Sequence, residues 1–210
     1  MTDTETRAFY DAVAEDYAEH FRTGLAPLPL ERALLTTFAE LVAPDGEVAD
    51  LGCGPGWATA HLASLGLRVF GLDLSEAMLT VARREYPGLR FVQGSMRKLA
   101  LPDGALAGAV SWYSSIHTPV DELPHLVTEF HRVLAPGAPL LLAFQAGDEP
   151  RRLSEPWGHP VTLDFLRRDP EDMTALLTST GFEPLSRTLK EQDTARGETA
   201  PQAFLIARRQ

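Results

Sequence analysis

Two stretches near the start of the chain carry apolar residues at a spacing of three to four, with polar residues between them. The first stripe comprises Phe9, Val13, Tyr17 and Phe21, and the second comprises Leu30, Leu34, Phe38, Leu41 and Val42. This spacing places the apolar side chains on one face of a helix. The sequence therefore predicts two N-terminal helices, joined by an irregular connection rich in glycine and proline at residues 24–29.

From residue 47 onward, short apolar runs alternate with longer amphipathic stretches. The runs predict strands at residues 47–51, 68–72, 89–93, 106–112 and 139–144. The last of these is almost entirely apolar, which is typical of a strand covered on both faces. Strands that alternate with helices usually lie parallel in one sheet, and the helices cross over between them.

The pattern is least regular over residues 147–168, which are rich in proline, glycine, arginine and acidic residues. We expect a lid-like loop here. Asp169 and Pro170 then have the residue types of a helix N-cap and of the first helical position. Residues 182–190 and 201–208 are predicted to form two final strands, paired as a hairpin.

Composition limits the number of domains. The chain has 210 residues, of which 44% are hydrophobic, enough for one full-sized core but too few for two ordinary domains. We therefore expect a single domain over residues 1–210. Its expected parts are an N-terminal helical cap at 1–45, a core at 46–146, the lid-like loop at 147–168, and a C-terminal helix and hairpin at 169–210.

Charge narrows the range of partners. The formal net charge is −10, from 29 acidic and 19 basic residues. Nucleic acid is bound through its phosphates by basic surfaces, so a nucleic-acid partner is not expected. Residues 1–7 lack the apolar core of a signal peptide, and no apolar run approaches the roughly 18 residues of a membrane span. We therefore expect a cytoplasmic protein without a membrane partner, and the oligomeric state stays open.

The cysteine and histidine content indicates neither a disulfide nor a metal site. Cys53 is the only cysteine, which leaves no intrachain disulfide and no multi-cysteine zinc site. Histidines and carboxylates have no convincing metal-ligand spacing, so no metal site is expected.

The candidate chemistry begins with the turn at residues 50–56, which follows the first predicted strand and precedes a helix. Gly52 and Gly54 lack Cβ atoms, as needed where a ligand approaches the backbone or where φ is positive. The helix that follows presents unpaired N–H groups to a ligand. Asp73, at the end of the second predicted strand, can accept hydrogen bonds from both hydroxyls of a ribose. Together these features predict that residues 46–146 form a core that binds an adenosine cofactor.

Two details separate the adenosine cofactors. In the dinucleotide fingerprint the third glycine lies three residues after the second, but here Gly56 comes after two and Trp57 stands at the fingerprint position. Asp50, at the mouth of the loop, would repel a pyrophosphate. S-adenosylmethionine has no phosphate and carries an ammonium and a sulfonium, so an acidic loop suits it. An NAD-dependent oxidoreductase is therefore the less favoured interpretation.

The segment from Val48 to Gly56, followed by Asp73, resembles the class I S-adenosylmethionine-dependent methyltransferase family of the small-molecule type, and the likeness extends to Ala146. The resemblance implies an α/β fold, a Rossmann-like three-layer sandwich whose seven-stranded sheet is mostly parallel with an antiparallel last strand. It also implies S-adenosylmethionine as the cofactor, with S-adenosylhomocysteine as its product.

Ligands of open α/β sheets bind beyond the carboxyl ends of the strands, which limits the candidate cofactor residues. They are Tyr17, Asp50, Gly52, Cys53, Gly54, Asp73, Leu74, Met78, Ser95, Met96, Ser111 and Trp112. The resemblance implies that a tyrosine of the N-terminal helix, best matched by Tyr17, reaches the cofactor's carboxylate. Ser95 departs from the pattern, because the family commonly has an acidic residue there. For Tyr17, Met78 and Trp112 the alternative is simple packing.

Methyl transfer from a sulfonium depends chiefly on alignment and on the exclusion of water, and such positioning is worth roughly 7–11 kcal/mol. A base is needed only where the acceptor must lose a proton. His117, on the loop after the fourth predicted strand, is the candidate general base, because histidine titrates near neutrality. Tyr113 is a second candidate. The alternative for His117 is a loop histidine that forms local hydrogen bonds.

The sequence lacks the Pro-Pro-aromatic tetrapeptides of DNA and RNA amino-methyltransferases. With the acidic composition, this favours a small-molecule acceptor, whose identity stays open. The predicted function is S-adenosylmethionine-dependent methyl transfer to that acceptor. The alternative is a non-catalytic protein that binds S-adenosylmethionine or S-adenosylhomocysteine, because the binding motif is better specified than the catalytic one.

Overall fold

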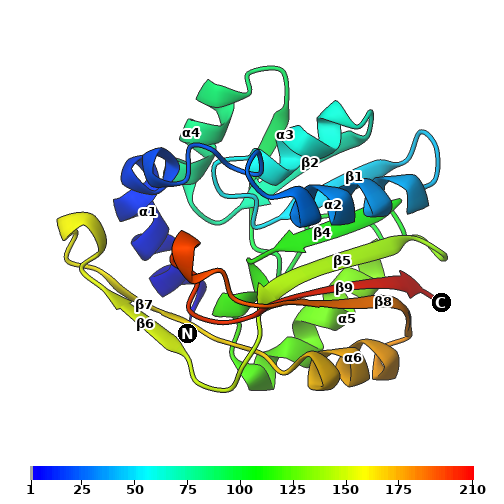
Figure 1. Ribbon diagram of the computed structural model, residues 1–210. Helices are drawn as coiled ribbons and strands as arrows, with labels where there is room; N and C mark the ends of the chain where they lie inside the picture. The colour runs from blue at the N-terminus through cyan, green and yellow to red at the C-terminus, as the bar shows by residue number, and fades with distance from the viewer. Residues whose placement is uncertain (1) are drawn as a thin grey trace.

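Within residues 2–210, which the computed structural model describes, seven strands form one sheet in the order β3-β2-β1-β4-β5-β9-β8 (Figure 1). The strands are β1 (Glu47–Leu51), β2 (Arg68–Asp73), β3 (Arg90–Gln93), β4 (Gly108–Trp112), β5 (Pro139–Gln145), β8 (Phe182–Lys190) and β9 (Gln202–Arg209). β9 runs antiparallel to its neighbours β5 and β8, and the other pairs are parallel. The mostly parallel sheet with an antiparallel last strand is therefore confirmed.

Helices cover both faces of this sheet, which gives the predicted three layers (Figure 1). They are α1 (Asp3–His20), α2 (Pro29–Leu41), α3 (Trp57–Ser64), α4 (Glu76–Glu85), α5 (Leu123–Val133) and α6 (Pro170–Ser179). Side chains alternate between the two faces along β5. Leu141 packs with residues of α2 and α3, whereas Leu140 and Leu142 pack with residues of α5 and α6. Burial on both faces explains the continuous apolar run of this strand.

Local signals start the helices where the sequence predicts them. α1 begins with a capping box, in which the Thr2 hydroxyl accepts the N–H of Glu5 at 3.2 Å and the Glu5 carboxylate accepts the N–H of Thr2 at 2.7 Å. Such a box pairs two N–H groups that the helix itself leaves unpaired. Ser75 caps α4 and Asp169 caps α6, each through a side-chain oxygen.

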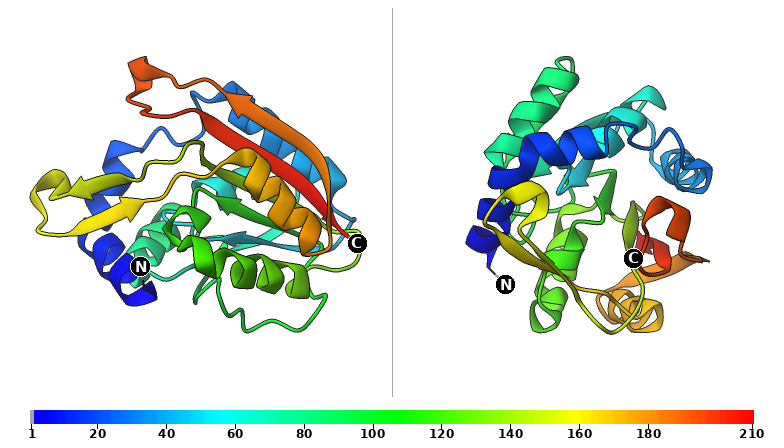
Figure 2. Two further views of the ribbon diagram at one scale, coloured as in Figure 1. Left: turned by 90° about the horizontal axis from the view of Figure 1, so that it is seen from below. Right: turned by 60° about the vertical axis from the view of Figure 1, so that its left-hand side comes forward.

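Residues 147–168, expected to be an irregular loop, contain a two-stranded antiparallel sheet. It is formed by β6 (Arg151–Ser154) and β7 (Thr162–Phe165). Leu163 of β7 is buried against Phe9 and Val13 of α1, so this β6-β7 hairpin lies beside the N-terminal helix (Figure 2). Its strands have only four residues each, too few for the alternation of Leu163 and Phe165 with polar residues to stand out in the sequence. That the segment acts as a lid stays a prediction.

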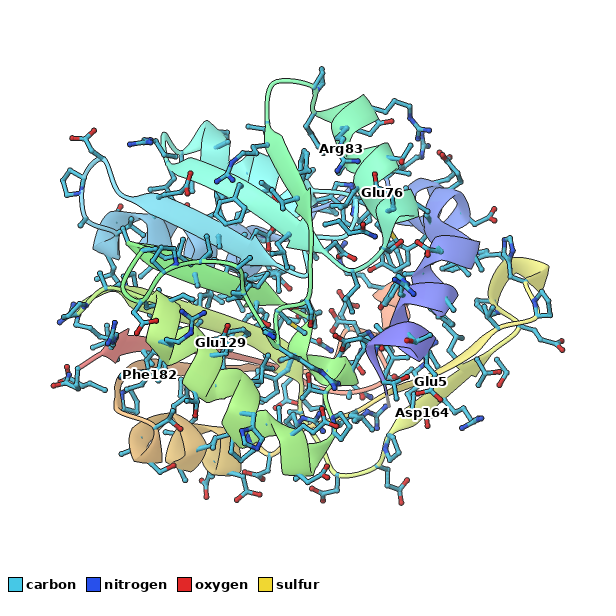
Figure 3. All side chains as sticks on the ribbon, turned by 180° about the vertical axis from the view of Figure 1, so that it is seen from behind. Glu5, Glu76, Arg83, Glu129, Asp164 and Phe182 are labelled. Carbon is cyan, nitrogen blue, oxygen red and sulfur yellow. The ribbon has the colours of Figure 1, made fainter. Side chains whose placement is uncertain are left out.

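The connection between β3 and β4 contains no helix among the described residues and is held to α5 instead. Glu129 of α5 (Figure 3) accepts the N–H of Leu99 at 2.6 Å, and Arg132 of the same helix donates to the carbonyl oxygen of Leu101 at 2.8 Å. β4 begins at Gly108 rather than at the expected residue 106, because Leu106 forms only an isolated bridge to Leu134. No helix in residues 2–210 is both long enough and apolar enough to span a bilayer.

Candidate active site

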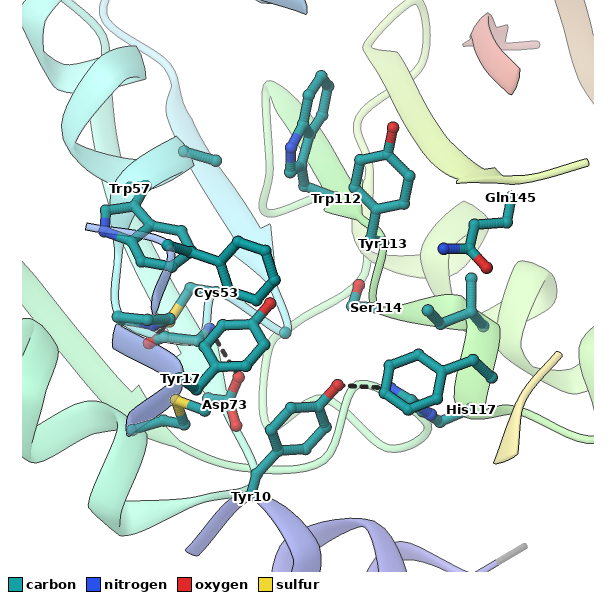
Figure 4. Close-up of a pocket in the computed structure, with 18 of the residues that line it drawn as sticks. Tyr10, Tyr17, Cys53, Trp57, Asp73, Trp112, Tyr113, Ser114, His117 and Gln145 are labelled. Atoms are coloured by element: carbon teal, nitrogen blue, oxygen red, sulfur yellow. Dashed lines mark hydrogen bonds between the residues drawn. The ribbon is translucent and has the colours of Figure 1, made fainter. Parts of the chain in front are cut away.

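A cavity of about 610 Å³ lies at the carboxyl ends of the central strands, bounded on the other side by α1 and the β6-β7 hairpin (Figure 4). Asp50, Asp73, Trp112 and Gln145 line it from β1, β2, β4 and β5. Open α/β sheets bind their ligands at this edge. The volume is within the range of roughly 300–1,000 Å³ that is usual for small-molecule sites.

Two glycines of the loop after β1, Gly52 and Gly54, have different roles. Gly54 has φ +52°, and a Cβ atom there would meet nothing within 4 Å. Gly52 has φ +77°, and its Cβ would lie 2.3 Å from Cβ of Ser114. Gly52 is therefore required by packing and backbone conformation, whereas Gly54 leaves open space where a ligand can approach the main chain.

Asp73 ties the end of β2 to this loop. Its Oδ2 accepts the N–H of Gly54 at 2.8 Å, and its Oδ1 accepts the N–H of Ser75 at 2.9 Å. Burial raises the pKa of Asp73, and the two backbone hydrogen bonds oppose that rise. An ionised carboxylate accepts about four hydrogen bonds, so two hydroxyls of a ligand can still be held.

Asp50 is fully buried at the base of the same wall. Its Oδ2 accepts the hydroxyl of Thr59 at 2.6 Å, while Oδ1 has no protein partner among the described residues. Burial raises the pKa of Asp50 to about 7, and the charge of Asp73 adds to the rise. A buried oxygen without a partner is rare in proteins. A cationic ligand group with N–H donors is the partner that would suit this oxygen.

Aromatic rings of α1, α3 and the hairpin surround the loop. The ring of Tyr17 stacks on Trp57, with centroids 5.8 Å apart and planes 17° apart. Phe21 lies 4.8 Å from Tyr17, and Trp157 at the hairpin tip lies 6.3 Å from it, both measured between ring centroids. Trp157 reaches this place because the hairpin packs against α1.

His117 is held in a short 3-10 turn, η1 (Ser115–His117), and is only 5% exposed. Its Nε2 lies 2.7 Å from the hydroxyl of Tyr10, and its Nδ1 lies 3.3 Å from the carbonyl oxygen of Asp164 (Figure 4). Burial lowers the pKa of His117 to about 4, so the ring is neutral at pH 7. Because both ring nitrogens have partners, His117 reaches a ligand only through Tyr10 in this arrangement.

Tyr113, the second predicted base, follows β4 with a φ of 56°, which is unusual for a residue other than glycine. Its ring forms a cluster with those of Trp112 and Phe204, at centroid distances of 5.7 and 6.3 Å. Burial raises the pKa of Tyr113 well above 10, and the charges of Glu31 and Glu198 add to the rise. The hydroxyl therefore stays protonated near neutrality and lines the cavity as a polar group.

Two of the predicted cofactor residues lie outside the cavity wall. Ser95 donates to a carboxylate oxygen of Asp3 at 2.6 Å and accepts the N–H of Arg97 at 3.2 Å. Ser111 is fully buried, with its hydroxyl 2.8 Å from that of Ser114. The others line the cavity: Tyr17, Asp50, Gly52, Cys53, Gly54, Asp73, Leu74, Met78, Met96 and Trp112. Met78 is only 1% exposed, so most of its surface packs within the protein.

Sequence reasoning missed Tyr10 and Gln145 as cavity residues. For Tyr10 a signal exists, because it lies seven residues before Tyr17 and so shares a face of α1 with it. For Gln145 the signal is its place at the end of a central strand. Among residues 2–210, no group of three or more His, Cys, Asp and Glu side chains is placed to hold a metal ion.

Known proteins resemble this chain in sequence. Residues 48–137 match the family described as a methyltransferase domain. A probable S-adenosylmethionine-dependent methyltransferase of Mycolicibacterium smegmatis is 31% identical over 140 residues, covering 65% of this chain and 52% of that protein. A malonyl-[acyl-carrier protein] O-methyltransferase of Serratia marcescens is 30% identical over 114 residues, covering 54% of this chain and 44% of that protein. The chain thus spans about half the length of these curated relatives.

Solved structures share the fold over nearly the whole chain. The CcbJ methyltransferase of Streptomyces caelestis is 18% identical with a TM-score of 0.74, covering 100% of this chain and 99% of that one. The 1,6-didemethyltoxoflavin-N1-methyltransferase of Burkholderia thailandensis, solved with 1,6-didemethyltoxoflavin and S-adenosylhomocysteine, is 19% identical with a TM-score of 0.72. It matches 98% of this chain and 88% of its own. At these identities the likeness concerns the fold.

Proposed function

The chain belongs to the class I S-adenosylmethionine-dependent methyltransferase family, and on this premise we propose that it transfers a methyl group from S-adenosylmethionine to a small-molecule acceptor. S-adenosylmethionine supplies an electrophilic methyl group on a sulfonium. The residues of the cavity have to bind the cofactor, align the acceptor and exclude water, which is the larger part of catalysis for such a transfer.

The unpartnered oxygen of Asp50 is the observation that carries this proposal. A buried carboxylate oxygen beside a glycine loop suits an ammonium group and opposes a pyrophosphate. Asp73 would hold the ribose hydroxyls, and the open main chain at Gly54 would accommodate the amino-acid part of the cofactor. Leu74 and Met96 provide the apolar surface for an adenine ring.

The other side of the cavity supports a small acceptor. Phe165, Leu153 and Ile116 give it an apolar lining, with the hydroxyls of Tyr10 and Tyr113 among them. α1 and the hairpin enclose this space. The relative from Burkholderia thailandensis holds a small molecule together with S-adenosylhomocysteine, which favours the same arrangement here.

Calorimetric titration of the purified protein with S-adenosylmethionine, S-adenosylhomocysteine and NAD tests the cofactor. We expect the first two to bind and NAD to give no heat. Because the pKa of Asp50 lies near 7 without ligand, affinity should rise from pH 6 to pH 7.5 as the carboxylate forms. Asp50→Asn should remove this rise, and Asp121→Asn, at an exposed site, should keep it. Binding of NAD alone would contradict the proposal.

Turnover separates an enzyme from a non-catalytic binding protein. The protein is incubated with S-adenosylmethionine and a panel of small amines, phenols and thiols, and formation of S-adenosylhomocysteine is measured. Production that depends on one class of acceptor supports methyl transfer. Tight cofactor binding with no product above the rate without protein would favour the binding-protein alternative.

A further inference from the structure

The hydrogen-bonded pair of Tyr10 and His117 lines the cavity, with Tyr10 beside Asp73 and His117 on the side away from Cys53 and the glycine loop (Figure 4). Tyr10 comes from α1 and His117 from η1, and their contact of 2.7 Å joins residues 107 positions apart. The ring of Tyr10 lies 5.9 Å from that of Tyr17, between centroids, so the pair stands where the space proposed for the cofactor meets the space left for an acceptor.

The positions of the protons in this pair follow from its third member. The carbonyl oxygen of Asp164 can only accept, so the contact at 3.3 Å requires the ring hydrogen of His117 to be on Nδ1. Nε2 is then a lone pair, and it can only accept the hydroxyl hydrogen of Tyr10. A tyrosine hydroxyl has one hydrogen. The oxygen of Tyr10 consequently presents only lone pairs to the cavity.

This arrangement is stable over the neutral range. Burial lowers the pKa of His117 to about 4, so Nε2 stays unprotonated at pH 7. Burial also raises the pKa of Tyr10 well above 10, with the charges of Tyr17 and Asp73 adding to the rise, so its hydroxyl hydrogen stays in place. His117 thus fixes Tyr10 as a hydrogen-bond acceptor.

Aromatic rings pack against both members of the pair. The ring of Phe165 lies 5.0 Å from that of His117, and the ring of Phe9 lies 5.3 Å from that of Tyr10, both edge-on. A ligand that displaces water here must give the Tyr10 oxygen a donor, because a buried acceptor without a partner is unfavourable. Sites built around such a hydrogen bond reject analogues that lack the donor.

We propose that Tyr10 binds the methyl acceptor by accepting a hydrogen bond from the N–H or O–H of the atom that is methylated, with His117 as its positioning residue. The inference rests on the proposed function and narrows its substrate class to largely apolar compounds with an N–H or O–H nucleophile. Where that atom carries a single hydrogen, as in a hydroxyl or a ring N–H, the methylated counterpart lacks it. The same contact therefore binds the acceptor more tightly than the product.

Phenol and anisole test this inference, since anisole is phenol with the hydroxyl hydrogen replaced by methyl. Each is titrated into the protein saturated with S-adenosylhomocysteine, and binding is followed by the shifts of amide resonances near the cavity. We expect phenol to bind about tenfold more tightly than anisole to the unmodified protein. Tyr10→Phe should abolish the preference, and Tyr86→Phe, the same change outside the cavity, should retain it.

His117→Leu distinguishes positioning from mere packing. Without Nε2 the hydroxyl of Tyr10 is free to turn and to donate to the ether oxygen of anisole, so the preference for phenol should shrink while Tyr10 is intact. Equal affinities in the unmodified protein, a preference that survives Tyr10→Phe, or binding of neither probe would overturn the inference. Failure to bind S-adenosylhomocysteine would instead count against the proposed function, and the two probes would then be compared on the ligand-free protein.

Discussion

Asp73 accepts a hydrogen bond from the backbone N–H of Gly54 at 2.8 Å, across 19 residues of chain. The carboxylate that ends β2 thus closes the glycine loop that follows β1. Its other oxygen accepts the N–H of Ser75, at the start of α4. One side chain therefore fixes the relative position of two strand ends, and it does so on the cavity wall where the cofactor is proposed to bind.

Asp73→Asn should weaken both functions of this residue. One carboxylate oxygen becomes an NH₂ group, which cannot accept from Gly54 or from a ribose hydroxyl. The loss of hydrogen bonds to a charged group should reduce the affinity for S-adenosylhomocysteine by roughly 1.5–3 kcal/mol, measured by calorimetry. Asp121→Asn, at an exposed position, is the matched control. An affinity equal to that of the unmodified protein would remove Asp73 from the site.

The sheet and the helices that flank it could be predicted because their signals are local. The run of apolar residues at 139–144 and the caps at Ser75 and Asp169 each lie within one element. The β6-β7 hairpin escaped prediction because Leu163 is the only fully buried residue among its eight strand positions. What holds it in place is its contact with α1, which no spacing along the hairpin encodes.

The residues of the site, too, could be predicted only where their signals are local. The glycine loop and Asp73 were predicted as cavity residues because strand ends of a parallel sheet meet at one edge. The partner of His117 was not, because Tyr10 lies 107 residues away on a helix that packs across that edge. Ser95 does not line the cavity, and its hydroxyl donates instead to Asp3 in the first turn of α1, a contact between residues 92 positions apart.

Gly54 and Gly66 form a matched pair for testing the loop. Both have positive φ, +52° and +91°, and at both a Cβ would meet nothing within 4 Å. Alanine at either position should therefore destabilise the fold by about 1–2 kcal/mol through its backbone conformation alone. Gly54→Ala should in addition lose affinity for S-adenosylhomocysteine, because its methyl group occupies the approach to the main chain. Equal affinities of the two variants would show that no ligand group approaches Gly54.

Because the pKa of His117 is lowered in the folded protein, we expect the protein to lose stability in acid. Its pKa is about 4 in the folded protein and about 6.5 when unfolded, so the unfolded chain binds more protons between these values. The contribution of the neutral ring is complete above pH 6.5 and is lost as the pH falls toward 4. Relative to His117→Asn, the free energy of unfolding should decrease by roughly 3 kcal/mol from pH 7 to pH 4.

Urea unfolding at several pH values measures this difference. Subtracting the curve of His117→Asn isolates the histidine, because other titrating groups, Asp50 among them, are common to both proteins. His125→Asn, which changes an exposed histidine of α5, should reproduce the curve of the unmodified protein. A difference between the unmodified protein and His117→Asn that does not vary with pH would mean that the ring is protonated equally in both states.

From the contacts of Trp157 we expect this side chain to hold the tip of the hairpin against α1. Its ring lies 5.5 Å from that of His20 and 6.3 Å from that of Tyr17, between centroids, and neighbouring His159 contacts Asp16 at 2.7 Å. Trp157 is 42% exposed, so Trp157→Ala should change global stability little while freeing the hairpin tip from α1. Amide exchange should then accelerate in residues 151–165, and S-adenosylhomocysteine should dissociate several-fold faster. Val120→Ala, at a residue 69% exposed and outside the cavity, is the control. Unchanged exchange in 151–165 would mean that Leu163 and its neighbours hold the hairpin without the tryptophan.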